Sequence, residues 1–230
     1  RDPDAGSSAT LLRLSITPPG GAEVGKALLL SGGMDSAALA WWLKPDLAVF
    51  IDYGQRPAAA EKRAAEKIAE EVGIPFEAVH IDCSPLGSGQ LVGSAALPEA
   101  PTPEWWPYRN QLLITMAAAI ALRRGHLKSI VIGSVAEDEV NADGTAAFRL
   151  ALDTVMKLQE GCIGVEAPAA SMTSTDLIRA SGIPPEVLGW THSCFASDVP
   201  CLRCRGCNKH LNVLDDLHRR WPQISCDAVS

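Results

Sequence analysis

Short apolar runs alternate with amphipathic stretches along most of this chain. Four to six consecutive apolar residues, bounded by turn-forming residues, are typical of strands buried on both faces of a parallel sheet. Stretches with apolar side chains every three or four positions are typical of the helices that cover such a sheet. The alternation therefore predicts an α/β fold, doubly wound around five parallel strands. The expected strands are residues 27–30, 47–51, 76–81, 129–132 and 162–167.

Two segments carry the clearest helical pattern. Residues 57–72 have an apolar residue at every fourth position from Ala60 and stop before Gly73, so we expect an amphipathic helix. Residues 109–124 are more apolar and end in a basic turn, which predicts a helix buried against the sheet. Between them, residues 82–106 are rich in Pro, Gly and Ser and too long for a simple connection, which favours a lid or binding loop.

The pattern changes near both ends of the chain. Residues 1–26 are expected to be an extension, with an edge strand at residues 12–16 where apolar and polar side chains alternate. Residues 27–190 are expected to form the α/β domain. Residues 191–230 contain a cysteine cluster and are expected to form a small helical region.

Length and charge narrow the classes of partner. The chain has 230 residues, enough for one α/β domain with an appendage, and a formal net charge of -7. This net charge gives no argument for tight binding along a nucleic-acid backbone, so a small ligand or a protein is the expected partner. No apolar stretch is long enough to span a bilayer, and no signal-peptide pattern opens the chain. We therefore expect a cytoplasmic protein with no membrane contact.

The motif "SGGMDS" lies where the first expected strand gives way to a helix. Backbone amides at a helix start have no partner within the helix and carry the positive end of its dipole, so they bind anions. The two glycines let a phosphate approach the backbone, and the two serines offer hydroxyl groups. The aspartate can cap the helix or hold a magnesium ion. The residues expected to hold phosphate and ion are Ser31, Gly32, Gly33, Asp35 and Ser36.

An ordinary glycine-rich connection is the alternative, and for a lone Gly-Gly turn it would be the better interpretation. The motif matches neither the Walker pattern nor the dinucleotide pattern. It resembles the SGGxDS pyrophosphate loop (PP-loop) of the ATP pyrophosphatase superfamily, whose members split ATP between the α and β phosphates and transfer AMP to an acceptor. The resemblance implies ATP and Mg²⁺ as cofactors. It also implies a Rossmann-like fold of the adenine nucleotide alpha hydrolase type for residues 27–190.

Further segments resemble the QueC family, 7-cyano-7-deazaguanine synthase. "FIDYGQR" at residues 50–56 is similar to the family's Y-x-Q-R segment, and "WPYRN" at residues 106–110 to its V-P-x-R-N. "IVIGSVAEDEV" at residues 130–140 resembles its fourth strand and the loop that ends in Asp. The resemblance implies a queuosine-pathway ligase that adenylates the carboxylate of 7-carboxy-7-deazaguanine. Ammonia then gives the amide, and a second activation gives the nitrile.

The same resemblance assigns roles to particular residues. Arginines can neutralise a carboxylate or the α-phosphate through two parallel hydrogen bonds. Asp138 is expected to accept hydrogen bonds from a guanine-like base, and Asp52, at a strand end, to contact the adenine or ribose. The alternatives are that Arg109 is a surface residue before a polar helix cap and that Asp138 belongs to a solvated acidic loop. The expected catalytic residues are Asp35, Arg56, Arg109 and Asp138; Asp52 and Gly133 join the nucleotide site; the expected substrate site comprises Tyr53, Gln55, Arg109, Asn110, Asp138 and Asp143.

Two stretches depart from the QueC pattern. Where the family has P-D-C-R, this chain has Asp143 followed by Gly144 and Thr145, and Arg149 one helical turn further on is a candidate for the missing charge. The expected helix start in "APAASMTSTDL" has no lysine where the family often has one; Thr173 to Thr175 would cap the helix instead.

These departures leave open which acceptor receives the activated acid. One variant passes it to a protein amine, as would suit the QueC-like accessories of bacterial antiphage systems. A tRNA-thiolating enzyme is disfavoured by the acidic composition, and a non-catalytic ATP-binding module is the remaining alternative. A homodimer is one expectation for the assembly.

The stretch "CFASDVPCLRCRGC" has C-x6-C-x2-C-x2-C spacing. Four thiolates can close a tetrahedral site around structural Zn²⁺, and the QueC-like family carries a similar site. An iron–sulfur cluster is the rival, but the x3-C-P that continues a ferredoxin run is absent here. Basic residues around the cluster, Lys209 among them, can offset the charge of the thiolates or contact tRNA. The expected ligands are Cys194, Cys201, Cys204 and Cys207.

Overall fold

The computed structural model describes residues 25–220. The edge strand expected at residues 12–16 therefore lies outside the described residues. Within them, five parallel strands form one sheet in the order β3-β2-β1-β4-β5, which confirms the predicted fold class. The strands are β1 (Gly25–Leu29), β2 (Leu47–Asp52), β3 (Phe76–His80), β4 (Leu127–Val131) and the short β5 (Gly164–Glu166).

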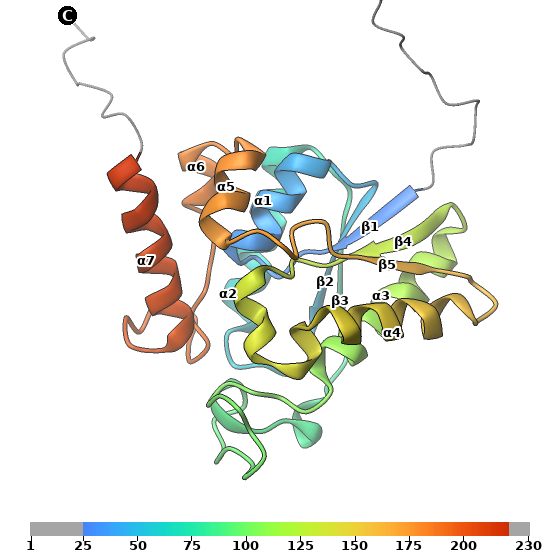
Figure 1. Ribbon diagram of the computed structural model, residues 1–230, viewed down its shortest axis with the longest axis horizontal. Coiled ribbons are helices and arrows are strands. Elements are labelled where there is room, and N and C mark those ends of the chain that lie inside the picture. Colours follow the sequence, from blue (N-terminus) through green and yellow to red (C-terminus); the bar gives the residue numbers. More distant parts are fainter. Residues whose placement is uncertain (1–24, 221–230) are drawn as a thin grey trace, which may run out of the picture.

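Helices cover both faces of this sheet (Figure 1). One apolar cluster joins α1, α2, α5, α6 and α7 to one face, and a second joins α3 and α4 to the other. This two-layer cover is the doubly wound arrangement that the alternating pattern predicts. The helices are α1 (Met34–Leu43), α2 (Ala58–Val72), α3 (Arg109–Arg124), α4 (Ala146–Lys157), α5 (Ser174–Ser181), α6 (Pro185–Leu188) and α7 (Arg205–Arg220).

The two strongest helical patterns behave as expected. In α2 the apolar stripe from Ala60 to Ile68 is buried, and Gly73 ends the helix in the left-handed conformation with φ 77°. In α3 only one face is buried, and Leu122 at the edge of that face is 49% exposed. The helix packs on the sheet through its small alanines and is not enclosed on all sides.

The chain reverses its winding direction between β1 and β4, which are neighbours in the sheet. The loops that leave these two strands diverge to opposite faces and open a crevice at their carboxyl ends. Open α/β sheets bind their ligands in this crevice. The topology therefore places the "SGGMDS" loop and the loop after β4 side by side.

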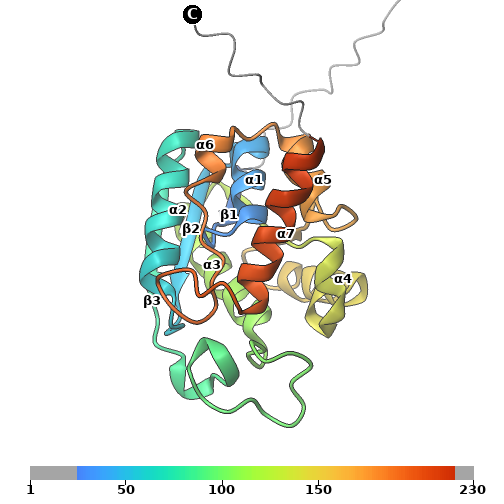
Figure 2. The ribbon, with the colours of Figure 1, turned by 90° about the vertical axis from the view of Figure 1, so that its left-hand side faces the viewer.

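Helix α7 lies across the layer formed by α1 and α5 (Figure 2). Its Val213 and Leu217 are buried in the same apolar cluster as α1 and α5, so this part of the C-terminal region shares the core of the α/β domain. No helix within residues 25–220 has the length and apolar character needed to cross a membrane.

Candidate functional site

The "SGGMDS" loop turns directly from β1 into α1. Gly33 precedes the helix in an extended conformation, and no side chain of the described residues caps the first turn of α1. Its amides therefore remain open to an anion. The hydroxyls of Ser31 and Ser36 lie 3.1 Å apart, and Ser36 Oγ donates to the carbonyl of Gly33 at 3.0 Å. The turn is thus held in shape before any ligand arrives.

Gly32 fixes where this loop sits. It has φ +80°, and a Cβ built on it would lie 2.5 Å from the backbone oxygen of Glu61 on α2. Gly133, after β4, has a similar constraint, because a Cβ there would lie 3.3 Å from the amide nitrogen of Ser36. Both glycines permit close approach of backbone segments, so the loop is pressed between α2 and the end of β4.

Asp35 lies in the first turn of α1 and meets a partner from the other end of the chain. Its Oδ2 accepts a hydrogen bond from Lys209 Nζ of α7 at 2.9 Å. Its Oδ1 is buried and has no hydrogen-bond partner among residues 25–220. Burial opposes the charge on Lys209, but Asp35 and Asp138 outweigh it and raise the pKa of Lys209, which remains an ammonium. The free Oδ1 is the kind of hard oxygen that binds Mg²⁺.

Three cavities of about 230 to 270 Å³ surround the loop and share Ser31 and Gly133 in their walls. The first, called the strand-end cavity, is lined by Arg109, Asn110, Asp138 and Asp143. The second, called the tyrosine-side cavity, is lined by Tyr53, Gln55, Glu61, Arg109 and Asn110. The third lies beside the cysteine-rich segment, is called the knuckle-side cavity, and is lined by Asp35, Glu61, Asp138, Ser174, Phe195 and Lys209. Most of the residues predicted for nucleotide and substrate therefore meet in one place.

Arg109 begins α3 and is half-buried. It lines two cavities, and the helix cap is Tyr108 rather than Asn110, so the surface-and-cap alternative does not describe it. Burial disfavours its charge, but Tyr53, Asp143 and Glu61 raise the pKa of Arg109. The guanidinium thus stays charged at the mouth of both cavities.

Glu61, in the first turn of α2, is a site residue that sequence reasoning missed. Gln55 Nε2 donates to its carboxylate at 2.8 Å, and Gln55 Oε1 accepts from the amide of Tyr53 at 2.8 Å. Burial raises the pKa of Glu61 to about 7, against the opposing effects of Gln55 and Arg109. A sequence signal existed, because Glu61 precedes the buried Ala65 by four residues and so shares its helix face.

Tyr53 is held in place beside this group. It is buried, and its ring meets Trp106 edge to face with centroids 4.8 Å apart. Burial raises the pKa of Tyr53 to about 12. The phenol therefore stays neutral and serves the tyrosine-side cavity as a hydrogen-bonding group.

Asp138 differs from its acidic neighbours. It is half-buried, whereas Glu137 and Glu139 are exposed, and its Oδ2 accepts from the amide of Val135 at 3.0 Å. Burial raises the pKa of Asp138. It lines two of the three cavities, so a solvated acidic loop does not describe this carboxylate.

Two predicted residues lie apart from these cavities. Arg56 is exposed and packs over Gly93. Asp52 accepts from the amide of Gly54 at 3.1 Å and lies 3.1 Å from His80 Nδ1. Neither lines the three cavities, and their assigned roles remain predictions.

The stretches that depart from the QueC pattern have defined structures. A Cβ at Gly144 would lie 2.1 Å from the carbonyl oxygen of Asp138, so this turn requires glycine. Arg149 donates to the carbonyl of Gly144 and to Ser134 Oγ at 3.3 Å, which brings a cation next to the strand-end cavity. Thr173 caps α5 by accepting from the amide of Asp176 at 3.1 Å, as expected.

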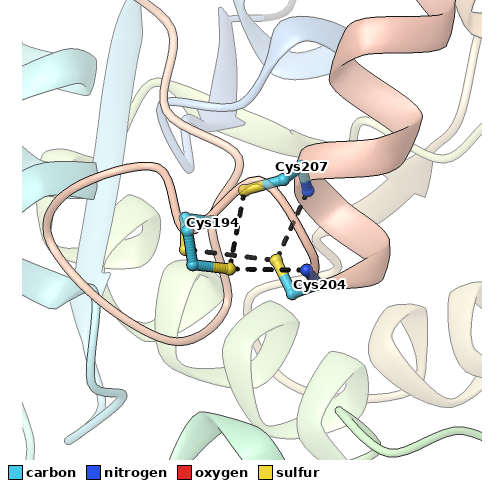
Figure 3. Close-up of side chains that lie close together, drawn as sticks. Cys194, Cys204 and Cys207 are labelled. Carbon is cyan, nitrogen blue, oxygen red and sulfur yellow. Dashed lines mark hydrogen bonds between the residues drawn. The ribbon is translucent and has the colours of Figure 1, made fainter.

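The four cysteines form a compact cluster, and Figure 3 labels three of them, Cys194, Cys204 and Cys207. Their sulfur atoms all lie within 4.8 Å of one another, with Cys201 to Cys207 at 3.9 Å and Cys194 to Cys204 at 4.0 Å. A tetrahedron with metal–sulfur bonds of 2.3 Å has edges of about 3.8 Å. Amides of Arg203 and Cys204 lower the pKa of Cys201 to about 6. The geometry therefore suits one metal ion held by thiolates.

This cluster is attached directly to the "SGGMDS" loop, residues 31–36, which is called the phosphate loop from here on. The cysteine knuckle, defined here as residues 192–207, begins with a hydrogen bond from the amide of His192 to the carbonyl of Gly32 at 2.9 Å. Asp198 accepts from the amide of Ala60 at 3.1 Å, and Arg205 lies 3.1 Å from Glu104 in the long loop. The knuckle thus forms one wall of the site.

Comparison with known proteins identifies relatives of this chain. A family model described as "Queuosine biosynthesis protein QueC" matches residues 26–217. The 7-cyano-7-deazaguanine synthase of Persephonella marina is 31% identical over 209 residues, 81% of this chain and 90% of the relative. That of Azotobacter vinelandii is 32% identical over 200 residues, 78% of this chain and 88% of the relative.

Among solved structures, the U34-tRNA thiolase NcsA from Methanococcus maripaludis, with its [4Fe-4S] cluster, aligns with a TM-score of 0.49 and 19% identity. The alignment covers 86% of this chain and 67% of that one.

Proposed function

Because this chain belongs to the QueC family, we propose that it is an ATP-dependent carbon–nitrogen ligase that adenylates the carboxylate of 7-carboxy-7-deazaguanine. One observation carries this proposal. The open amides of the phosphate loop face the same group of cavities as the half-buried Arg109 and Asp138. A nucleotide and an acidic, guanine-like substrate can therefore meet there.

The phosphate loop is proposed to hold the β and γ phosphates of ATP. The amides at the start of α1 and the hydroxyls of Ser31 and Ser36 supply the donors. Asp35 Oδ1, buried without a partner among the described residues, is the proposed ligand of Mg²⁺. The ion supplies charge neutralisation at the phosphates.

Arg109 and Asn110 line the cavities on the opposite side from α1 and are proposed to orient the acid. A carboxylate oxygen attacks the α-phosphorus, the bond to the bridging oxygen breaks, and pyrophosphate leaves. Arg109 neutralises charge on the carboxylate or the α-phosphate. Asp138 accepts hydrogen bonds from the amino face of the base.

Glu61 is proposed to serve the second half of the reaction. An amine attacks the carbonyl carbon of the acyl-adenylate, AMP leaves, and one proton must be taken from the nitrogen. Glu61 lines two cavities and has a pKa near 7, which suits a group that accepts a proton at neutral pH. With ammonia the product is the amide; activation of the amide oxygen by a second ATP and loss of AMP gives the nitrile.

A protein amine is the second candidate for the acceptor. The turn at Gly144 has room for no side chain, and the nearby positive charge comes from Arg149 of α4. This wall of the site therefore differs from the family pattern in its backbone as well as in its side chains. An altered wall beside the acid favours an altered acceptor. A QueC-like accessory of an antiphage system is a setting in which a protein would receive the acid.

We assign zinc to the cysteine cluster. Sulfur separations of 3.9 and 4.0 Å match one tetrahedral ion, whereas thiolates around a four-iron cluster bind four different irons and lie farther apart. All four positions are filled by protein, so the role of the ion is structural. It fixes the knuckle and the start of α7.

The test is incubation with MgATP and 7-carboxy-7-deazaguanine, with and without ammonium, followed by mass spectrometry and pyrophosphate assay. Pyrophosphate and AMP that appear only when the acid is present support the proposal, and nitrile formation identifies ammonia as acceptor. Asp138→Asn should reduce turnover, while Glu160→Gln, which is exposed and lines none of the three cavities, should not. ATP binding without acid-dependent pyrophosphate would refute the ligase and leave the non-catalytic module.

A further inference from the structure

The side chain of Lys209 reaches the phosphate loop, although the residue belongs to the C-terminal helix α7. It lies in the first turns of α7, two residues after the metal ligand Cys207, and its Nζ is 2.9 Å from Asp35 Oδ2. It lines the knuckle-side cavity together with Ser31 and Gly33 of the loop. The ammonium therefore lies beside the amides that would bind an anion.

The surrounding charges show what this ammonium faces. The titratable side chains that line the knuckle-side cavity besides Lys209 are the acids Asp35, Glu61 and Asp138 and the histidines His192 and His210. Lys209 is the one Lys or Arg in its wall within residues 25–220. A triphosphate brought into such an acidic cavity needs positive charge besides the helix dipole. The α5 start on the same cavity, at Ser174, has no lysine to provide it.

We propose that Lys209, carried to the phosphate loop by the cysteine knuckle, is the ammonium that binds the triphosphate of ATP in this chain. The proposal rests on the nucleotide site of the proposed function. Asp35 would then serve two cations: its Oδ2 accepts from the ammonium, and its Oδ1, without a partner among residues 25–220, could coordinate a magnesium ion. Both oxygens belong to the first turn of α1, where the β and γ phosphates are expected.

The plainer account is that Lys209 offsets the negative charge of four thiolates. The contacts favour the loop instead. Within residues 25–220, the hydrogen bonds to the cysteine sulfur atoms come from backbone amides and other thiols, whereas Lys209 Nζ donates to Asp35. Its side chain is 37% exposed, so it remains accessible to a ligand entering the cavity. Cys207 and Lys209 share one helical turn, which makes the metal site the support that positions the ammonium.

Calorimetric titration of the zinc-loaded chain with MgATP and with AMP tests this role. Lys209→Gln should weaken ATP binding by roughly ten- to a hundredfold, as expected for loss of a charge-assisted hydrogen bond, and leave AMP binding unchanged. Lys209→Arg should recover part of the ATP affinity. The control Arg203→Gln removes an exposed cation from the same knuckle and should change neither affinity.

Zinc content by mass spectrometry and acid-dependent pyrophosphate release complete the design. Equal ATP affinity of Lys209→Gln and wild type would overturn the proposal, as would loss of zinc with equal weakening of ATP and AMP. A wild type that binds ATP through Lys209 but releases no pyrophosphate with the acid would refute the ligase and keep the inference. A wild type that binds no MgATP would refute both.

Discussion

The phosphate loop and the cysteine knuckle are two walls of one cavity, built by different forces. The loop lies between β1, at the centre of the sheet, and the fully buried Ala37 to Ala40 of α1. The knuckle has its own small cluster, made of the four cysteines with Phe195 and Ala196. Apolar burial fixes the first wall in any folded chain, whereas the second wall is expected to depend on the metal ion proposed for the cysteines. On that proposal, the site is complete only when the metal is bound.

Loss of one cysteine ligand should have the largest effect on the stability of the knuckle wall relative to the phosphate loop. Cys204→Ser removes a buried ligand, so we expect loss of zinc, a decrease in the free energy of unfolding of about 3 kcal/mol or more, and loss of the α7 wall. Zinc analysis and denaturant unfolding measure this. Cys162→Ser, exposed and outside the cluster, is the control. Equal stability of the two variants would contradict a metal-built wall.

Gly32→Ala changes the phosphate loop and leaves the four cysteines intact. Both the positive φ and the 2.5 Å approach of a Cβ to Glu61 oppose the substitution, so we expect about 3 kcal/mol of destabilisation and at least tenfold weaker ATP binding. Gly73→Ala has φ +77° but nothing within 4 Å, so it carries the backbone strain alone, about 1 kcal/mol. Denaturant unfolding of both variants gives the difference. Equal losses would mean that the loop is not pressed against α2.

Glu61 lies where the two walls meet, and its pKa gives a pH test. With a pKa of about 7 in the folded chain and 4.5 as its ordinary value, folded Glu61 holds a proton that the unfolded chain has released between these pH values. The free energy of unfolding should therefore fall by about 2 kcal/mol as pH rises from 4.5 to 7. Glu61→Gln should remove this decrease, and the exposed Glu66→Gln on the same helix should retain it. If the free energy of unfolding depended on pH in the same way for wild type and Glu61→Gln, burial would not raise the pKa of Glu61.

The smallest expected effect concerns the tie between the knuckle and the long loop. Arg205 is 47% exposed and Glu104 9% exposed at the side chain, with 3.1 Å between them. Arg205→Gln should cost about 1 kcal/mol, because Arg205 is half-exposed and the Gln amide can still donate a hydrogen bond to the buried Glu104 carboxylate. A double-mutant cycle with Glu104→Gln isolates the pair, and Arg203→Gln is the matched control. A coupling energy of several kcal/mol would mean that this contact, rather than the metal, anchors the knuckle.

Most of the fold was predictable because it depends on local patterns. Alternating apolar runs indicated the five strands, and the stripe from Ala60 with Gly73 after it indicated α2 and its end. The limits of the fifth strand were less accurate: residues 162–167 were expected, and β5 spans Gly164–Glu166. Its position in the sheet is set by pairing with β4, which the residues of β5 do not encode.

The candidate site was predictable where it is continuous in sequence. Arg109, Asn110 and Asp138 line the cavities around the phosphate loop, whereas Arg56 and Asp52 lie apart from them. A motif indicates that a residue type is present but not the direction of its side chain. Arg56 and Gln55 are neighbours, yet one is exposed and the other buried.

By itself, the sequence determined the class of fold, the glycine-rich turn between β1 and α1 and the group of four cysteines, because each depends on residues close together in the chain. Only the tertiary structure decided which charges complete the site. Lys209 meets Asp35 across 174 positions, and Glu61 reaches the same cavity from α2. Such encounters follow from the packing of α7 and α2 around one core, where burial over the whole domain, and not local spacing, sets the geometry.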